Sequence, residues 1–269
     1  MKFAEIEKGR KVQMKFGVCG KLPEMAKAKA LGFDYLEPPV NGIAAMTEEE
    51  FQAALEQAKE IGLPCPAFNL LFPKNLMLLE KDTANEAIAE YLEGAMARVQ
   101  ALGGKVAVFG SGKSRNRPEG VSYGEAFRRL VEVTRLTGEI AGKYGVTIVI
   151  EPLNRGETNM ICSMAEGAAL VAAADEPHVQ LLSDYFHVAK DGEPVEDIVR
   201  LGGVCHTHIA TKEGRRYPVE EGGDQFRLFF HCLKETGYQG MMSVEGKTDD
   251  MEADGPKALA LLKKLEEEA

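Results

Sequence analysis

Residues 146–151 read Val-Thr-Ile-Val-Ile-Glu, a short β-branched run that ends in an acid. The stretch before it, residues 122–143, has the apolar spacing of a helix, and Gly145 stands between the two. A glycine at this place is typical of the left-handed residue that ends a helix. The helix therefore returns the chain to a buried strand, which is the connection that neighbouring parallel strands require.

The same alternation of strand-like runs and helical stretches extends along the whole chain. Strands are predicted at 15–19, 35–37, 66–69, 105–109, 146–150, 179–183, 203–208 and 241–244. Helices are predicted near 22–31, 47–61, 83–102, 122–143, 163–174, 194–200, 224–236 and 253–267. Eight βα units of roughly 32 residues each predict an α/β protein with a single (β/α)8 TIM barrel. An open doubly wound sheet is the alternative, but Gly110-Ser-Gly112 is only a fragment of the G-x-G-x-x-G turn of such sheets.

Composition limits the class of protein. The 269 residues contain no Pro/Gly/Ser-rich linker, so one domain is predicted over 1–269, with residues 1–13 as a short N-terminal extension. The net charge of −10 disfavours nucleic acid as a partner, because phosphates would be repelled. The five scattered cysteines form no C-x-x-C pair, which favours a reducing cytoplasm over a disulfide framework or a zinc knuckle.

Two further observations concern membranes and export. No apolar run reaches the ~20 residues that a membrane-spanning helix needs. The first eleven residues are too charged for the core of a signal peptide. The sequence therefore predicts a cytoplasmic protein without a membrane partner.

Polar residues close four consecutive strands of the predicted barrel. They are Glu151, Asp184, the pair His206 and His208, and Glu245. In a TIM barrel the carboxyl ends of the strands form the active site, so these side chains are expected to share one rim. A single acid behind a strand could equally cap the next helix, but three acids around a narrow mouth would repel one another without a cation. The mixed oxygen and nitrogen set therefore predicts a site for a divalent cation.

These strand ends resemble those of the xylose-isomerase-like sugar isomerases and epimerases, and look most like the ketose 3-epimerases and hydroxypyruvate isomerases. The segments that carry the resemblance are Ile150-Glu-Pro-Leu-Asn-Arg155 with Glu157, Ser183-Asp-Tyr-Phe-His187, His206-Thr-His208 and Val244-Glu245. The resemblance covers all eight βα units, although only the second half of the chain carries the specific motifs. It implies a metal-dependent sugar isomerase or epimerase, with Mn²⁺ as the first choice of metal and Co²⁺, Mg²⁺ or Zn²⁺ as alternatives.

The resemblance also assigns roles to individual residues. It implies that the metal is held by Glu151, Asp184, His208 and Glu245. Glu151 and Glu245 would double as the acid and base, while Glu157 and His187 would hydrogen-bond the polar end of the substrate near its carbonyl.

The loop after the histidine pair departs from the epimerase pattern. The epimerases usually place a substrate-binding arginine six residues after the ligand histidine, where this chain has Gly214, followed by Arg215 and Arg216. If residues 212–218 are extended, neighbouring side chains face opposite sides. Arg215 is then expected to reach the substrate and Arg216 to point away, whereas a turn at Gly214 could exchange the two.

Several other residues at strand ends have two interpretations. Asn69 and Glu37 end earlier strands, and each could face the pocket or cap a loop; for Asn69 we predict contact with the substrate. His206 shares a side of its strand with His208 and is expected to be a core group or a partner of the ligand rather than a ligand itself. Cys19 is expected to line the pocket without acting as a nucleophile.

The loop 110–118 combines Gly and Ser with Lys113, Arg115 and Arg117. Such a loop can grip a phosphate or carboxylate, or it can simply be solvated. The sequence leaves both interpretations open. Nothing in it matches a P-loop, so nucleotide hydrolysis is not indicated.

The chemistry that suits the strand ends is removal of a proton next to a ketose carbonyl. A divalent cation stabilises the negative charge that grows on the carbonyl oxygen, and two carboxylates can remove and return the proton. The expected substrate is a small sugar or a sugar-like polyol or keto compound, and a homo-oligomer stays open.

Three other functions fit parts of the sequence. An inosose-dehydratase-like lyase would share the enolisation step. An apurinic-site endonuclease would need more histidines than the five present and a basic surface. A non-catalytic sugar-binding barrel is disfavoured because no ligand position is lost.

Overall fold

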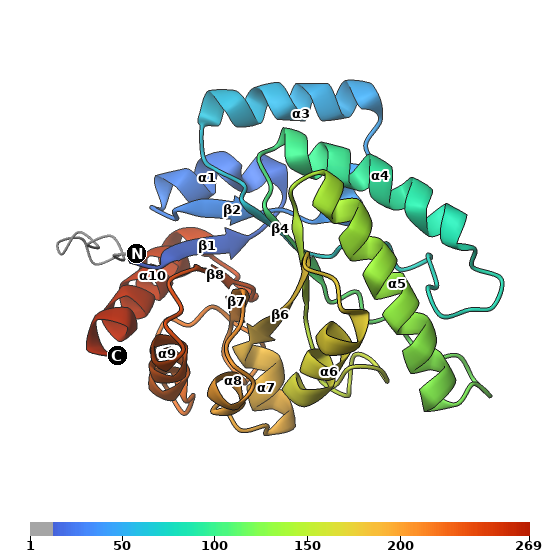
Figure 1. Cartoon of the computed structure of the whole chain (residues 1–269). Coiled ribbons are helices and arrows are strands. Elements are labelled where there is room, and N and C mark those ends of the chain that lie inside the picture. The colour runs from blue at the N-terminus through green and yellow to red at the C-terminus, as the bar shows by residue number, and fades with distance from the viewer. Residues whose placement is uncertain (1–12) are drawn as a thin grey trace, which may run out of the picture.

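Eight parallel strands form one sheet in the order β2-β1-β8-β7-β6-β5-β4-β3, and helices surround it (Figure 1). The computed structural model describes residues 13–269. The strands are β1 (Lys15–Cys19), β2 (Tyr35–Glu37), β3 (Ala67–Phe68), β4 (Val106–Phe109), β5 (Thr147–Ile150), β6 (Val179–Asp184), β7 (His206–Ile209) and β8 (Met241–Val244). A parallel bridge between Pro39 and Asn69 joins the two outer strands of this order, so the sheet forms the expected TIM barrel.

Within residues 13–269 there are ten α-helices, nine between successive strands and one after β8. They are α1 (Met25–Ala30), α2 (Val40–Ala44), α3 (Glu48–Ile61), α4 (Asn85–Ala101), α5 (Tyr123–Lys143), α6 (Met164–Ala174), α7 (Tyr185–Asp191), α8 (Asp197–Arg200), α9 (Phe226–Glu235) and α10 (Met251–Glu268). In this described part of the chain, no helix combines the length and apolar character needed to cross a bilayer. The N-terminal extension predicted at 1–13 lies outside the described residues except for Gln13.

Local signals explain where the main helices begin and end. The side chains of Thr47 and Ser122 each accept a hydrogen bond from the backbone N–H three residues further on. The glutamate at that position accepts one in turn from the backbone N–H of Thr47 or Ser122. These capping boxes satisfy backbone donors at the starts of α3 and α5. Gly145 has a φ of +65°, the left-handed conformation that the sequence predicted between α5 and β5. These caps set the boundaries of the βα units.

Two helices were not predicted from the sequence. α2 has five residues and α7 has seven, too few to show a helical period. The boundaries of α7 nevertheless carry recognisable signals, because the Asp184 side chain caps its first turn and Gly192 ends it in the left-handed conformation. The largest differences in strand bounds are at β3, which is shorter than the predicted 66–69, and at β7, which begins at His206 rather than at residue 203; β4, β5 and β6 each differ by one residue at one end.

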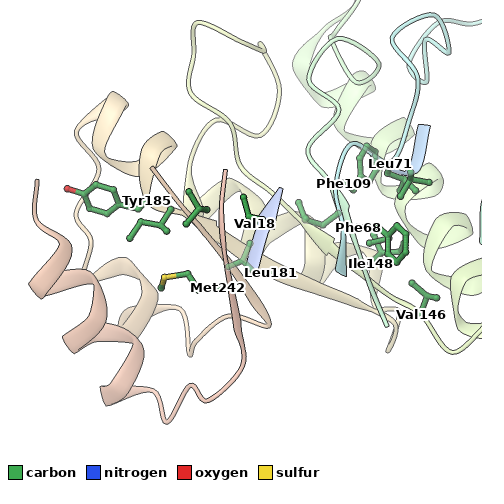
Figure 2. Packing of buried hydrophobic residues seen from close by; sticks show 14 of the residues in the cluster. Val18, Phe68, Leu71, Phe109, Val146, Ile148, Leu181, Tyr185 and Met242 are labelled. Carbon is green, nitrogen blue, oxygen red and sulfur yellow. The ribbon is translucent and has the colours of Figure 1, made fainter. Parts of the chain in front are cut away.

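Alternation along the strands divides the core into two layers. Ile148 and Ile150 of β5 belong to the large apolar cluster between the strands and the helices, part of which Figure 2 shows. Val149 points to the other side, into a small apolar cluster with Val108 and Leu182 inside the barrel. The period of two therefore carries Glu151, two residues after Val149, toward the inside as well.

Arg115, in the loop 110–118 for which the sequence left anion binding and solvation open, is buried and directed at backbone carbonyl oxygens. Arg115 is 1% exposed. Its guanidinium donates hydrogen bonds to the carbonyl oxygens of Phe109 (2.9 Å), Glu151 (2.8 Å) and Ile161 (3.3 Å). Arg117 donates to the carbonyl oxygen of Val121, and Lys113 is exposed. Arg115 thus ties the carboxyl ends of β4 and β5 to the loop after β5.

Arg115→Met is expected to lower the free energy of unfolding by about 2–4 kcal/mol, because three buried carbonyl groups each lose a charged hydrogen-bond donor. Thermal unfolding should show a melting temperature lower by roughly 4–16 °C for a chain of this size. The control is Lys113→Met in the same loop, which should stay within about 0.5 kcal/mol because Lys113 is exposed. An unchanged melting temperature in Arg115→Met would show that Arg115 is not a structural anchor.

Candidate active site

Four predicted metal ligands meet inside the barrel at the carboxyl ends of β5 to β8. Glu151, Asp184, His208 and Glu245 each offer one ligand atom, and these atoms all lie within 4.8 Å of one another. Strand register explains part of this convergence, since Asp184 is paired with His208 and His208 with Ser243, two residues before Glu245. Side chains two residues apart on a strand share a face.

One nitrogen of His208 faces two of the acids. Nδ1 lies 3.3 Å from Oε1 of Glu151 and 3.2 Å from Oε2 of Glu245. The other ring nitrogen, Nε2, lies 2.9 Å from Oε1 of Glu37, deeper in the barrel. Nδ1 is therefore the His208 atom that could coordinate a cation together with the acids.

Asp184 has two functions in the fold. Its Oδ1 accepts a hydrogen bond from the backbone N–H of Phe186 (2.8 Å) and so caps α7. Its Oδ2 faces the site, 3.4 Å from Nη2 of Arg215. The helix-capping and metal-binding interpretations of this acid are thus compatible.

Charge favours a cation at this point. Glu151, Asp184 and Glu245 would together carry three negative charges, and Arg215 offers one positive charge, with its Nη2 2.5 Å from Oε2 of Glu245. Burial acts to lower the pKa values of His208 and Arg215, but the surrounding acids outweigh it and raise both. With His208 neutral, the form that can bind a cation, the acids and Arg215 leave a charge of about −2, and this charge and the oxygen and nitrogen donors fit a divalent cation such as Mn²⁺, Co²⁺, Mg²⁺ or Zn²⁺.

The three acids differ in proton affinity because their neighbours differ. Burial, assisted by Glu245 and Glu151 against the opposing charge of Arg215, raises the pKa of Asp184 to about 7. Burial and the charge of Glu245 also raise the pKa of Glu151. Glu245 is half-buried, and although burial acts to raise its pKa, His208 and Arg215 lower it to about 2. Glu151 and Glu245 therefore lie in different electrostatic environments, as two groups with different proton-transfer tasks often do.

The polar residues predicted to contact substrate lie around the same acids. His187 is buried, and its Nδ1 accepts a hydrogen bond from the backbone N–H of Asn154 (3.0 Å). Burial lowers its pKa to about 3, so the ring is neutral and its hydrogen lies on Nε2, 3.5 Å from Oδ2 of Asp184. Glu157 is held by Asn154 Nδ2 (2.9 Å), and Asn69 Nδ2 donates to Oε1 of Glu245 (3.3 Å). The site thus offers a neutral donor beside several acceptors.

The loop after β7 is not extended, which corrects the premise from which the arginine positions were predicted. Gly214 has a φ of +74° and Arg215 a φ of +51°, so two successive left-handed residues turn the chain. Arg215 nevertheless points into the site, where its guanidinium lies 4.7 Å from the ring centre of Phe186. Arg216 points away and pairs with Asp249 (2.6 Å) at the surface. The turn does not exchange the two arginines, and the Lys247 N–H, which donates to the carbonyl oxygen of Arg215, ties this loop to the segment that follows β8.

Glu37 is the site residue whose position the sequence left most open. It is fully buried, and its carboxylate accepts hydrogen bonds from His206 and His208. Although burial acts to raise its pKa, the two histidines hold the pKa of Glu37 well below its usual range. His206 is thus a buried core group, as one of its interpretations expected, and its hydrogen-bond partner is Glu37. Burial raises the pKa of the Cys19 thiol, which argues against a nucleophile there.

Phe186, under the guanidinium of Arg215, is the contact that sequence reasoning missed. The only available signal was its place in the segment 183–187, between Asp184 and His187. The sequence does not show that an apolar residue between polar ones will contact a distant arginine side chain.

Comparison with known proteins identifies the relatives of this chain. The profile described as "Xylose isomerase-like TIM barrel" matches residues 25–265. D-psicose 3-epimerase of Agrobacterium fabrum is 25% identical over 228 residues, which are 83% of this chain and 78% of that protein. 3-Dehydro-D-guloside 4-epimerase of Escherichia coli is 26% identical over 113 residues, but this match spans only 42% of the chain and 43% of the relative.

Solved structures agree with these matches at the level of the fold. The crystal structure of a D-psicose 3-epimerase determined in the presence of D-fructose superposes with a TM-score of 0.82 and 22% identity, over 94% of this chain and 99% of that one. The resemblance to sugar epimerases that the strand ends predicted is therefore confirmed. The chain belongs to the xylose isomerase-like TIM barrel family.

Proposed function

We propose that this protein is a divalent-metal-dependent sugar isomerase or epimerase that moves a proton on the carbon next to a ketose carbonyl. The observation that carries the proposal is the approach of Glu151 from β5 and Glu245 from β8 to the same nitrogen of His208, at 3.3 and 3.2 Å. Two carboxylates that reach one point from different strands can serve two sides of a substrate held there. The sugar epimerases among the relatives support the same class of reaction.

The difficult part of such a reaction is the negative charge that develops on the carbonyl oxygen when the neighbouring proton leaves. A divalent cation held by Glu151, Asp184, His208 and Glu245 would supply Lewis-acid stabilisation of that charge. One of Glu151 and Glu245 would take the proton from one face of the carbon, and the other would return a proton to the opposite face. Return to the opposite face inverts the configuration, which is epimerisation.

Other side chains would orient the substrate. The neutral His187 can donate a hydrogen bond from Nε2 to an oxygen beside the carbonyl, because its other nitrogen is occupied by Asn154. Arg215 can donate to the oxygen-rich end of the sugar, and Glu157 and Asn69 would accept or donate at the pocket edge. The proposed substrate is a ketose or a related keto sugar. Cytoplasmic localisation and a homo-oligomer stay predictions.

Removal of metal by a chelator is expected to abolish activity, and Mn²⁺ or Co²⁺ should restore it. A panel of ketoses assayed for epimer, aldose and dehydrated product tests the reaction at the same time. The melting temperature should fall on stripping, because a ligand that binds only the folded state stabilises it. Full turnover of metal-free protein would contradict metal dependence, and dehydrated product alone would indicate a lyase.

Glu151→Gln and Glu245→Gln should each reduce epimerisation by at least about a hundredfold, since each would remove one partner of the proton transfer. In Glu245→Gln, exchange of the substrate hydrogen with deuterated solvent should persist through Glu151. The metal content of each variant must be measured in parallel, because both residues are proposed ligands. Complete loss of exchange in both variants at full metal content would point to a single shared base instead.

Arg215→Ala is expected to lower kcat/KM by roughly 10- to 100-fold, the effect of losing a charged hydrogen bond worth about 1.5–3 kcal/mol. Arg216→Ala is the matched control, because Arg216 pairs with Asp249 outside the site. Steady-state kinetics on the substrate found in the ketose panel measure both. Equal kcat/KM values for the two variants would show that Arg215 has no special role in binding.

A further inference from the structure

Glu37 lies inside the barrel at the end of β2 and uses both of its carboxylate oxygens. Oε1 accepts a hydrogen bond from Nε2 of His208 (2.9 Å). Oε2 accepts one from Nε2 of His206 (2.8 Å) and one from the hydroxyl of Ser243. The Ser243 oxygen is also hydrogen-bonded to the hydroxyl of Tyr35 (2.7 Å). Side chains of β2, β7 and β8 are thus joined through one carboxylate.

A fully buried carboxylate destabilises the folded state unless its partners compensate for the loss of hydration. Burying an ion costs several kcal/mol even in a favourable setting, and apolar side chains of similar volume often stabilise a core as well or better. The neighbouring part of the barrel interior is filled by such apolar side chains, namely Val108, Val149 and Leu182. The position of Glu37 therefore needs a reason other than packing, and its direct partners are the two histidines of β7 and Ser243 of β8.

The contact between Glu37 and His208 determines which atom of His208 is free to bind a cation. An ionised carboxylate can only accept hydrogen bonds, so Nε2 of His208 must carry a hydrogen. When the ring is neutral, Nδ1 then has a free lone pair. Nδ1 is the atom that lies 3.3 Å from Glu151 and 3.2 Å from Glu245.

We infer that Glu37 is a positioning residue for the metal site, which orients the His208 ring and keeps its hydrogen on Nε2 so that Nδ1 can bind the cation. The inference rests on the proposed function, since it requires a metal at these ligands. Carboxylates that accept the second N–H of a metal-bound histidine commonly act in this way.

His206 has a defined part in this arrangement. Its ring lies edge-to-face with that of His208, at 5.1 Å between centres and 82° between planes. Together with Ser243, it occupies Oε2 of Glu37, which leaves Oε1 to His208 alone. Rotation of the carboxylate would break contacts to both β7 and β8. His206 therefore holds Glu37 in the orientation that serves His208, without binding the cation itself.

Binding of Mn²⁺ to the metal-stripped protein, measured by titration calorimetry, tests the inference. Glu37→Gln is expected to weaken binding roughly 10- to 100-fold, because the amide presents a hydrogen-bond donor to one of two imidazole N–H groups. Thr207→Val is the matched control on the same strand: the Thr207 hydroxyl donates to the carbonyl oxygen of Met241 and makes no contact with Glu37, so the Kd of this variant should change by less than about threefold.

The results separate a positioning role from a purely structural one. A structural role would lower the melting temperature of the metal-free Glu37→Gln variant but leave its Mn²⁺ Kd unchanged, and that outcome would overturn the inference. Absence of Mn²⁺ binding by the unaltered protein would overturn the proposed metal dependence, and the inference with it.

A second measurement does not depend on the folding of a Glu37 variant. Long-range ¹H–¹⁵N spectra of the Zn²⁺-loaded, histidine-labelled protein report which ring nitrogen carries hydrogen. The His208 signals are identified by their loss in His208→Gln. A hydrogen on Nε2 and none on Nδ1 is the expected result, and a hydrogen on Nδ1 would refute the positioning role of Glu37.

Discussion

Repulsion among three carboxylates in a buried space is the constraint that organises this protein. Glu151, Asp184 and Glu245 approach one another inside the barrel, where little water screens their charges. Within the described residues, Arg215 contacts two of them directly and supplies part of the compensation. The remaining negative charge explains why the set suits a divalent cation, and why neighbouring groups have shifted pKa values.

The barrel makes this convergence possible because its strands are short, parallel and alternate strictly between two faces. On β5 and β6 the inward residues below the acids are apolar, Val149 and Leu182. On β7 and β8 they are polar, His206 and Ser243, and they meet Glu37 from β2. The interior is therefore divided into an apolar part that packs and a polar part that supports His208. The inward residues two positions before the proposed ligands therefore either pack the interior, on β5 and β6, or support the metal site, on β7 and β8.

Two arginines from the loops after β7 and β4 supply positive charge and hydrogen-bond donors at the carboxyl ends of the strands. Arg215 reaches the acids from a loop with two left-handed residues, and Phe186 lies against its guanidinium. Arg115, from the loop after β4, instead turns inward and satisfies three backbone carbonyl groups. Basic residues that look alike in sequence thus differ in function, because one enters the site and the other anchors the rim on which the site is built.

The sequence by itself determined the barrel, all eight of its strands and the four strand ends that meet in the site, because these depend on local periodicity and on the alternation of side chains. It missed α2 and α7, which are too short to show a period, and it could not place Phe186. Tertiary structure alone decided that Glu37 pairs with His206 and His208, whose positions are 169 and 171 residues further along the chain. It also decided that Arg215 enters the site from a turn rather than from an extended segment. The physical reason is that such contacts depend on how the barrel closes and on how flexible side chains share a few buried partners, and neither is encoded in the residues next to them.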